Sequence, residues 1–493
     1  MNETCMIEHH RKTLLILIVL ITLLGLFLRC YRLSSQSLWM DEISSVETAR
    51  VPLDEIVERS ASNNASPTYF LLLRPVVGKS NENIESKARL LSALAGTLSV
   101  PLFIGIVYLW RKDWRTALVG GLLLAINPLH IWYSQETRGY AVMLFFGLGC
   151  LLSFELARWK GKRWWAGYAL FAVLAAAIHK TGLVFPLACG LWEAWQAVRN
   201  RLRYRELAPH LVLILVVGLL LVQKSYPPAK EYGRASSVLE ILYTGLTFVG
   251  GYSFGPSLTE IQNYGAKAAV VGHAIQIGIA AVVLAMAGAV CIKRGRSFLA
   301  GKEVLLIGLG IGIVVIGSLV SSFPYNVRYA LPALFGFLAL IAAFAGGSPP
   351  KLFSRFVLAG ILAVNLWADL QWFYVPNYRK GDSRAVAQWL VQNGARVRTW
   401  TVLPDYLGFS IKWYLDSNPE ILSGYQPARE SQTTSFPPVP DVLIIGRRHH
   451  LLAPDEIIGS YRTNAGEARA IHSIAGFELY IRESTGKPGN PAP

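Results

Sequence analysis

Apolar stretches long enough to cross a lipid bilayer recur along most of this chain. A spanning helix needs about 20 mostly apolar residues. Charged residues make up only 16% of the sequence, against roughly 25% in a soluble domain. The first apolar run has no A-x-A site after it, so we expect a retained anchor rather than a cleaved signal peptide. The sequence predicts about eleven spanning helices, near residues 13–30, 89–110, 116–133, 139–157, 164–179, 182–198, 209–223, 266–291, 304–321, 330–346 and 356–373.

Basic residues alternate between the loops of this arrangement. The loops rich in Lys and Arg lie near residues 11–12, 111–115, 158–163, 199–205, 293–302 and 351–355. The short loops between them hold only Arg138, Lys180 and Arg328. Because cytoplasmic loops carry the excess of Lys and Arg, we expect a cytoplasmic N-terminus, an odd number of helices and a C-terminus outside. This pattern accounts for the net charge of +16. No nucleic-acid recognition module is visible, so nucleic acid is not an expected partner.

Two long outer loops and a C-terminal region interrupt the apolar pattern. In the first loop, near 29–87, residues 51–60 (VPLDEIVERS) predict a short amphipathic helix in the membrane interface. The second loop, near 224–265, is rich in Tyr, Gly, Ser and Pro, and we interpret it as a mobile cover. We expect residues 1–373 to form the membrane domain and residues 374–493 to form an extracytoplasmic domain.

The C-terminal region alternates between two periodicities. Residues 384–391, 407–415 and 456–461 predict helices, whereas 397–403, 442–445 and 477–481 predict strands. Alternating strands and helices are typical of a small α/β domain. The tail, 486–493, has the composition of a disordered terminus.

An acidic pair, Asp41 and Glu42, follows the first apolar helix within the stretch SLWMDEISS. A carboxylate at the membrane boundary can act as a general base, or can bind a divalent cation that bridges phosphates. Capping of a loop helix would also explain the pair. The five cysteines show no spacing typical of a metal site, and the sequence leaves open whether a divalent cation is used.

Three further outer loops offer polar groups. One contains Gln135, Glu136, Arg138 and Tyr140, where ionisable groups are costly unless paired or functional. The next contains His179 and Lys180, and the last contains Arg328 and Tyr329. Each cation can bind a phosphate, but an ion pair, snorkelling or interface anchoring would also explain it. Because all four loops are predicted on one side, we expect their side chains to gather there.

Five motifs occur in order along the chain: SLWMDEISS, ASPTYFLLL, KARLLSALAGTLSVPL, NPLHIWYSQETRGYAVML and NVRYALPAL. The chain is similar to bacterial and archaeal relatives of the dolichyl-phosphate-mannose protein mannosyltransferases, which are family 39 type glycosyltransferases with the GT-C fold, akin to the aminoarabinose transferase of lipid A. The C-terminal stretches YRKGDSRAVAQWL and PDYLGFSIKWYL also resemble the outer domain of such proteins.

The resemblance implies a polyprenyl-phosphate sugar donor and a site at the outer face. By motif match, Asp41 would be the base, and Glu42 would assist it or hold a cation. Glu136, Arg138 and Tyr140, with the neighbouring Gln135, match the family's second-loop stretch, and Arg328 with Tyr329 matches its late RY motif. These residues would shape the donor-phosphate or acceptor site. The acceptor would be a protein, a lipid or a glycan.

The chain departs from the family at one position. Many relatives carry His-Pro-Pro before a Tyr pair, whereas this chain has Ala65-Ser66-Pro67 before Thr68-Tyr69-Phe70. If that histidine binds a metal or the acceptor in relatives, this chain does so through another residue or not at all. Two alternatives remain at this stage: a transporter or lipid flippase, for which the sequence lacks paired broken helices, and a non-enzymatic glycan-assembly protein.

Overall fold

The computed structural model confirms a mostly helical chain with spanning helices. Among the residues described, five helices are long and apolar enough to cross a membrane, or six if the bent pair α6–α7 is one span. Shorter apolar helices cover Trp164–Ile178, Ile241–Gly250, Ala274–Met286 and Leu331–Gly346. The span expected near 209–223 lies almost entirely outside the described residues. These are 3–62, 65–200, 210, 213, 238–257, 260, 266–293, 301–321, 325–346, 352–427, 439–446, 451, 453–465, 469–474 and 476–482.

The chain forms two compact units. The first, here called the membrane unit, contains Met1–Leu33, Ser45–Phe254 and Ile275–Leu370. The second, the C-terminal unit, contains Ser34–Ser44, Gly255–Ala274 and Gln371–Pro493. A short segment of the first outer loop, including Asp41 and Glu42, therefore belongs to the same unit as the C-terminal sheet.

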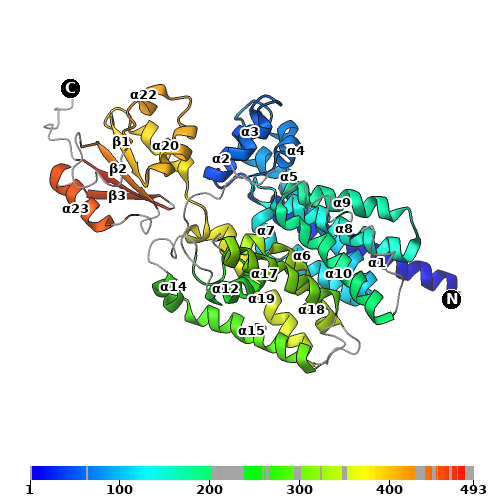
Figure 1. The fold of residues 1–493 in the computed structure, drawn as a ribbon. Helices are drawn as coiled ribbons and strands as arrows, with labels where there is room; N and C mark the ends of the chain where they lie inside the picture. The colour runs from blue at the N-terminus through cyan, green and yellow to red at the C-terminus, as the bar shows by residue number, and fades with distance from the viewer. Residues whose placement is uncertain are drawn as a thin grey trace. The chain divides into compact units, whose positions relative to one another are not determined.

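The membrane unit is built from helices (Figure 1). Helix α5 packs against α1, α4, α6, α7 and α8, while α8 also packs on α9, and α17 on α18. Arg29 on α1 is one of several charged residues buried in this unit, and its role is described below. The helices are α1 (Glu3–Cys30), α2 (Met40–Arg50), α3 (Ile56–Ser62), α4 (Pro67–Val77), α5 (Ile84–Arg111), α6 (Trp114–Ala125), α7 (Pro128–Ser134), α8 (Tyr140–Lys160), α9 (Trp164–Ile178), η1 (Lys180–Leu183), α10 (Val184–Asn200), α12 (Val238–Gly250), α15 (Ala274–Lys293), α17 (Lys302–Ser321), η3 (Val327–Tyr329), α18 (Leu331–Gly346) and α19 (Leu352–Tyr374).

The span expected at 116–133 is broken into α6 and α7, which are bent by 56°. Pro128 stands at the first turn of α7, where it has no N–H to give the preceding helix. The Asn127 side chain caps α7 by accepting the His130 N–H at 3.0 Å. The buried Arg29 guanidinium donates to the carbonyls of Leu124 and Ala125, at 3.0 and 2.9 Å. These bonds satisfy carbonyls that the break leaves without helical partners.

Both outer-loop interpretations need correction. Helix α3 begins at Ile56 rather than Val51, because a turn in which the Glu55 N–H donates to the Pro52 carbonyl precedes it. Ile56 is buried while Val57 is exposed. In the second loop, residues 238–250 form helix α12 rather than a loose cover. Its Leu246 and Val249 are buried against α15 and α19. The remainder of that loop lies largely outside the described residues.

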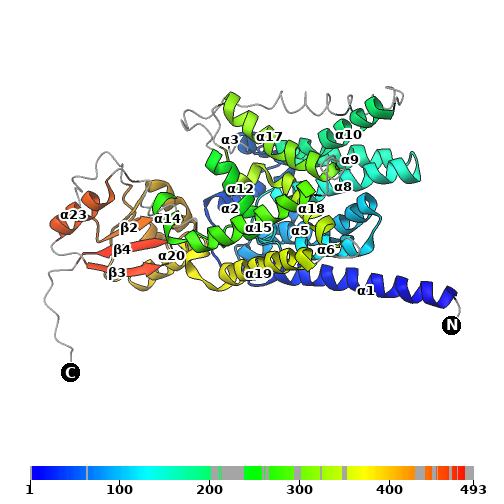
Figure 2. The same cartoon turned by 90° about the horizontal axis from the view of Figure 1, so that it is seen from below.

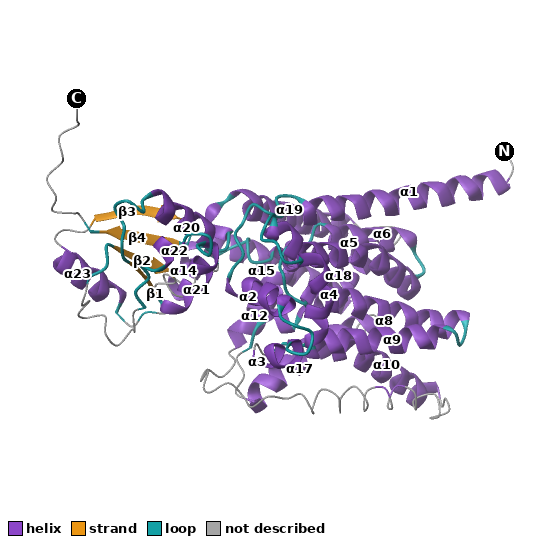
Figure 3. Cartoon of the chain, turned by 90° about the horizontal axis from the view of Figure 1, so that it is seen from above, coloured by secondary structure: helices purple, strands orange, loops and turns teal. Residues whose placement is uncertain are grey.

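The C-terminal unit contains a four-stranded sheet, seen in Figures 2 and 3. The strand order is β1-β2-β4-β3, with β1 and β2 parallel and the other two pairs antiparallel. The expected strands correspond to β1, β2 and β4, whereas β3 was not predicted. The elements are η4 (Pro376–Tyr378), α20 (Ser383–Gln392), β1 (Trp400–Leu403), η5 (Asp405–Leu407), α21 (Gly408–Tyr414), α22 (Pro419–Leu422), β2 (Val442–Gly446), α23 (Pro454–Ala465), β3 (Arg469–Ile474) and β4 (Phe477–Ile481), with α14 (Ala266–Gly272) before them.

Apolar clusters cover both faces of this sheet. Val442 and Ile444 of β2 pack with α20 and α21, whereas Leu443 and Ile445 pack with α23. Alternate residues of a strand point to opposite faces, so the continuous apolar run of β2 is explained by burial on both sides. Asp382 caps α20, accepting the Ala385 N–H at 3.0 Å. The expected tail, 486–493, lies outside the described residues.

Candidate active site

The acidic pair lies in the first turn of α2, within the C-terminal unit. The Glu42 carboxylate accepts the backbone N–H of Trp39 at 3.3 Å. A glutamate that reaches back to the residue before its helix forms half of a capping box. Glu42 is fully buried, whereas Asp41 is partly exposed. The two adjacent carboxylates therefore occupy different environments.

Glu42 pairs with a lysine far along the chain. The Lys380 ammonium lies 3.6 Å from the Glu42 Oε2, and its side chain is only 9% exposed. The same ammonium lies 5.2 Å from the centre of the Trp39 ring, a cation–π geometry. The Glu42 carboxylate is thus engaged by both a cation and a helix N-terminus. The structure gives Glu42 a structural environment, whereas sequence reasoning had linked it with catalysis or cation binding.

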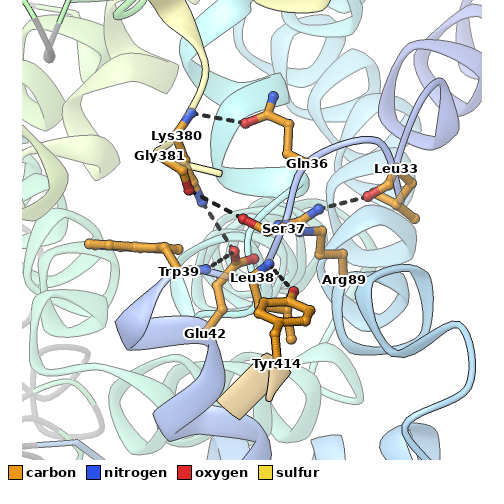
Figure 4. A network of polar contacts seen from close by, with 10 residues as sticks. All are labelled: Leu33, Gln36, Ser37, Leu38, Trp39, Glu42, Arg89, Lys380, Gly381 and Tyr414. Atoms are coloured by element: carbon orange, nitrogen blue, oxygen red, sulfur yellow. Dashed lines mark hydrogen bonds and ion pairs between the residues drawn. The ribbon is translucent and has the colours of Figure 1, made fainter. Parts of the chain in front are cut away.

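Hydrogen bonds between main-chain and side-chain groups hold the residues before the acidic pair, as Figure 4 shows. The Lys380 N–H donates to the Gln36 Oε1 at 3.1 Å, and the Ser37 hydroxyl donates to the Gly381 carbonyl at 3.2 Å. The Leu38 N–H donates to the Tyr414 hydroxyl at 2.7 Å. This segment is therefore fixed by main-chain and side-chain contacts within the C-terminal unit.

A second group of candidate residues gathers in the membrane unit around His179. Its ring is stacked with Tyr329 at 5.8 Å between centres and lies 5.1 Å from the Tyr140 ring. Burial, followed by the positive charges of Arg138, Arg328 and Lys180, lowers the pKa of His179 to about 3. A neutral histidine therefore lies among three cations that come from three separate loops. The expected gathering is observed for these residues.

Arg328 contacts Tyr329 and has a buried Nε. It donates to the Tyr329 hydroxyl at 3.2 Å, and its guanidinium carbon lies 5.1 Å from that ring centre. Its Nε is buried and has no hydrogen-bond partner among the described residues. A buried donor without a partner is costly. An anionic oxygen at this position would satisfy it with a charge-assisted bond.

The second-loop residues divide between two tasks. Arg138 donates to the Ser45 hydroxyl at 3.4 Å, and Glu136 is buried near Tyr133 and Tyr140. The Gln135 amide instead donates to the carbonyls of three residues at the end of α1, at 2.9 to 3.2 Å: Leu28, Arg29 and Tyr31. In this structure Gln135 caps α1, whereas sequence reasoning had assigned it to substrate.

The stretch that departs from the family lies beside this group. Pro67 occupies the first turn of α4, and the Ser66 hydroxyl donates to the Ala177 carbonyl near the end of α9. Ala177 lies two residues before His179 in the sequence. Ser66 therefore fastens α4 to the end of α9, next to the loop that holds His179.

Sequence reasoning did not assign a role to two tyrosines of this group or to Lys380, the partner of Glu42. Tyr133 and Tyr252 share a hydrogen bond of 2.8 Å between their hydroxyls. Tyr252 follows α12, and only the richness of its loop in tyrosine signalled it. Lys380 and Tyr414 lie in the two C-terminal stretches that resemble the family, so the resemblance was their only signal. Among the residues described, no group of three or more His, Cys, Asp and Glu has the arrangement of a metal site.

Comparisons with known proteins agree with this architecture. Residues 77–232 match the family model of the dolichyl-phosphate-mannose-protein mannosyltransferases, whereas no curated protein sequence matches the chain. The apo structure of ArnT from Cupriavidus metallidurans has a TM-score of 0.51 at 14% identity, covering 96% of this chain and 98% of that one. The chain has the GT-C fold of membrane glycosyltransferases.

A second similar structure is an archaeal oligosaccharyltransferase. The Archaeoglobus fulgidus oligosaccharyltransferase in complex with zinc and sulfate has a TM-score of 0.46 at 13% identity, covering 94% of this chain and 73% of that one. The matched family model describes a mannosyltransferase. The GT-C chain is a multi-pass membrane glycosyltransferase, which favours the enzyme over the transporter and assembly-protein alternatives.

Proposed function

We propose that this glycosyltransferase moves a hexose or pentose from a polyprenyl-phosphate donor to a protein, lipid or glycan acceptor on the outer face of the plasma or inner membrane. The N-terminus would be cytoplasmic, and residues 374–493 would form an extracytoplasmic domain. The distribution of basic loops supports this orientation. The family model also describes proteins that use a lipid-phosphate-linked sugar.

The observation that carries the proposal is the set of three cations around His179. Arg138, Lys180 and Arg328 come from different loops, yet all contribute to the electrostatic environment of one ring. Like charges repel, so such a group is favourable when an anion binds between them. A phosphate diester of a lipid-linked sugar supplies that anion, and the unsatisfied Arg328 Nε supplies a donor for it.

The chemistry needs charge stabilisation more than acid catalysis. In an inverting transfer, an acceptor hydroxyl or amine attacks the anomeric carbon, and the bond between this carbon and the phosphate oxygen breaks. The lipid phosphate leaves with one more negative charge, which cations can stabilise in the transition state. Tyr140 and Tyr329 would shape the pocket for the donor, and Glu136 would order the same loop.

The acceptor must lose a proton during this step. We assign that role to Asp41, whose carboxylate is partly exposed, and not to Glu42, which is buried in an ion pair. A positioned carboxylate contributes as a general base when it lies within hydrogen-bond reach of the acceptor proton. Transfer through Asp41 leaves the proton on the carboxylate, and solvent removes it afterwards.

The proposal is tested with purified full-length protein in liposomes that contain a polyprenyl-phosphate-linked sugar in the outer leaflet alone. We expect release of free polyprenyl phosphate and transfer of the sugar, both measured by mass spectrometry. Movement of intact donor between leaflets without release of polyprenyl phosphate would instead identify a flippase. In cells that lack the protein, an intact lipid-linked sugar should accumulate, and its mass would identify the sugar.

A further inference from the structure

The contacts around Glu42 extend the role of the C-terminal unit beyond that of an appended domain. Hydrogen bonds join residues 34–38 to residues 380–414. Arg384 donates to the carbonyls of Ser34 and Ser35 at 3.3 Å each, and the bonds of Gln36, Ser37 and Leu38 continue this series along the segment. The segment that precedes Asp41 is thus held at nearly every residue.

Burial makes the Glu42–Lys380 pair the decisive contact of this segment. The side chains are 0% and 9% exposed, respectively. Removing one partner from a buried pair leaves an uncompensated charge, which costs far more than losing a surface ion pair. The pair therefore restricts the positions that Lys380 and the first turn of α2 can adopt.

Asp41 precedes Glu42 directly in the helix. A helix turns by about 100° per residue because it has 3.6 residues per turn. The direction of the Asp41 side chain is therefore determined by how the first turn is anchored through Glu42 and Trp39. A contact that holds Glu42 fixes both the depth and the rotation of the carboxylate beside it.

We propose that Lys380 is a positioning residue for glycosyl transfer, which acts by holding Glu42 and thereby fixing Asp41. Residues 380–384 and Tyr414 form a clamp, and providing this clamp is a function of the C-terminal unit in catalysis. The inference rests on the proposed role of Asp41 as the base. It differs from the family resemblance, which linked Glu42 itself with the chemistry or with a cation.

Substitutions at Glu42 separate positioning from chemistry. In Glu42→Gln, the amide oxygen can still accept the Trp39 N–H, but the buried Lys380 ammonium loses its counter-charge. We expect kcat to fall by about 10-fold, the effect of losing one charge-assisted contact while the helix cap remains. Glu42→Ala removes the contacts altogether, so its kcat should fall by about 100-fold, the effect of a misplaced catalytic group.

Substitutions at Lys380 test the clamp itself. Lys380→Met keeps the length of the side chain and removes its charge, and we expect a loss in kcat of about 100-fold with the KM for the donor changed by less than about 3-fold. The double variant Glu42→Gln/Lys380→Met leaves no buried unpaired carboxylate. Its kcat should therefore exceed that of Lys380→Met. A purely structural role would lower the amount of folded protein without producing this recovery or the split between kcat and KM.

The outcomes also distinguish the clamp from the proposed function. Wild-type kcat in Lys380→Met would overturn the clamp, as would loss of activity in Glu42→Gln to the level of Asp41→Asn, because Glu42 would then act in chemistry. Full activity of Asp41→Asn together with loss in Lys380→Met would overturn the assignment of the base and with it the inference. Size-exclusion profiles and melting temperatures of the full-length variants in detergent serve to compare only folded protein.

Discussion

Replacing Arg328 by glutamine should weaken donor binding more than any other single change among the cations. Arg328 combines a partly buried guanidinium, a hydrogen bond to the Tyr329 hydroxyl and a buried Nε without a partner among the described residues. Glutamine keeps polarity and part of the length but removes the charge and the fork of donors. Arg328→Lys would restore the charge without the fork.

The magnitude follows from the hydrogen bonds to phosphate that the substitution removes. A hydrogen bond to a charged group contributes about 1.5–3 kcal/mol, and a factor of ten corresponds to about 1.4 kcal/mol. We therefore expect the Kd for polyprenyl phosphate to rise by roughly 10- to 150-fold in Arg328→Gln. Arg328→Lys should recover part of this affinity. The assay is titration of purified variants with a short-chain polyprenyl phosphate, followed by isothermal calorimetry in detergent.

The matched control is Arg115→Gln, which removes an exposed arginine that follows the cap of α6. Its Kd for polyprenyl phosphate should equal that of the wild type. A Kd within about 2-fold of the wild type in folded Arg328→Gln would refute the assignment of a phosphate to this arginine, because no charge-assisted bond of the expected strength would have been removed.

Three further predictions concern the surrounding structure. His179→Gln should make the protein less sensitive to acid. The pKa of His179 is about 3 in the folded state and 6.5 in the unfolded state, so the unfolded state binds more protons between these pH values. His179 therefore lowers the free energy of unfolding as pH falls from 6.5 towards 3. Melting temperatures from pH 7 to 5 test this, the loss being below about 2 kcal/mol because the ring is partly exposed. Gly182→Ala would place a Cβ 2.3 Å from the Ala175 carbonyl oxygen, so the loop of Lys180 should shift and the KM for donor should rise. Leu479→Ala, at a fully buried position of β4, should destabilise the C-terminal sheet by about 2–5 kcal/mol in calorimetric unfolding.

Periodicity and caps were enough to predict most of the fold. Strand β2 was visible as a run of four apolar residues, and α20 as a helix over residues 384–391. The break between α6 and α7 was missed because apolar content is continuous through Pro128, although Asn-Pro is itself a turn signal. Strand β3 (RAIHSI) was missed because its polar residues weaken the apolar pattern, whereas pairing with β4 stabilises it.

The candidate site could be predicted only in part. The cations of the membrane unit were visible because short outer loops otherwise lack them. The partner of Glu42 was not visible, since contacts such as that of Ser37 with Gly381 join residues 344 positions apart. Gln135 shows the converse: its motif suggested substrate binding, but three main-chain carbonyls engage its amide. Local patterns thus indicate which residue types are unusual, whereas tertiary contacts decide what each one does.

The most direct measurement is the single-turnover rate of sugar transfer by Asp41→Asn, with donor saturating and binding measured on the same preparation. Asparagine preserves size but cannot accept a proton at neutral pH. The rate should fall by at least about 100-fold, the lower range for loss of a general base, while the Kd for polyprenyl phosphate stays within about 3-fold because the cations around His179 are unchanged. A transfer rate near that of the wild type would contradict the assignment of Asp41 as the base.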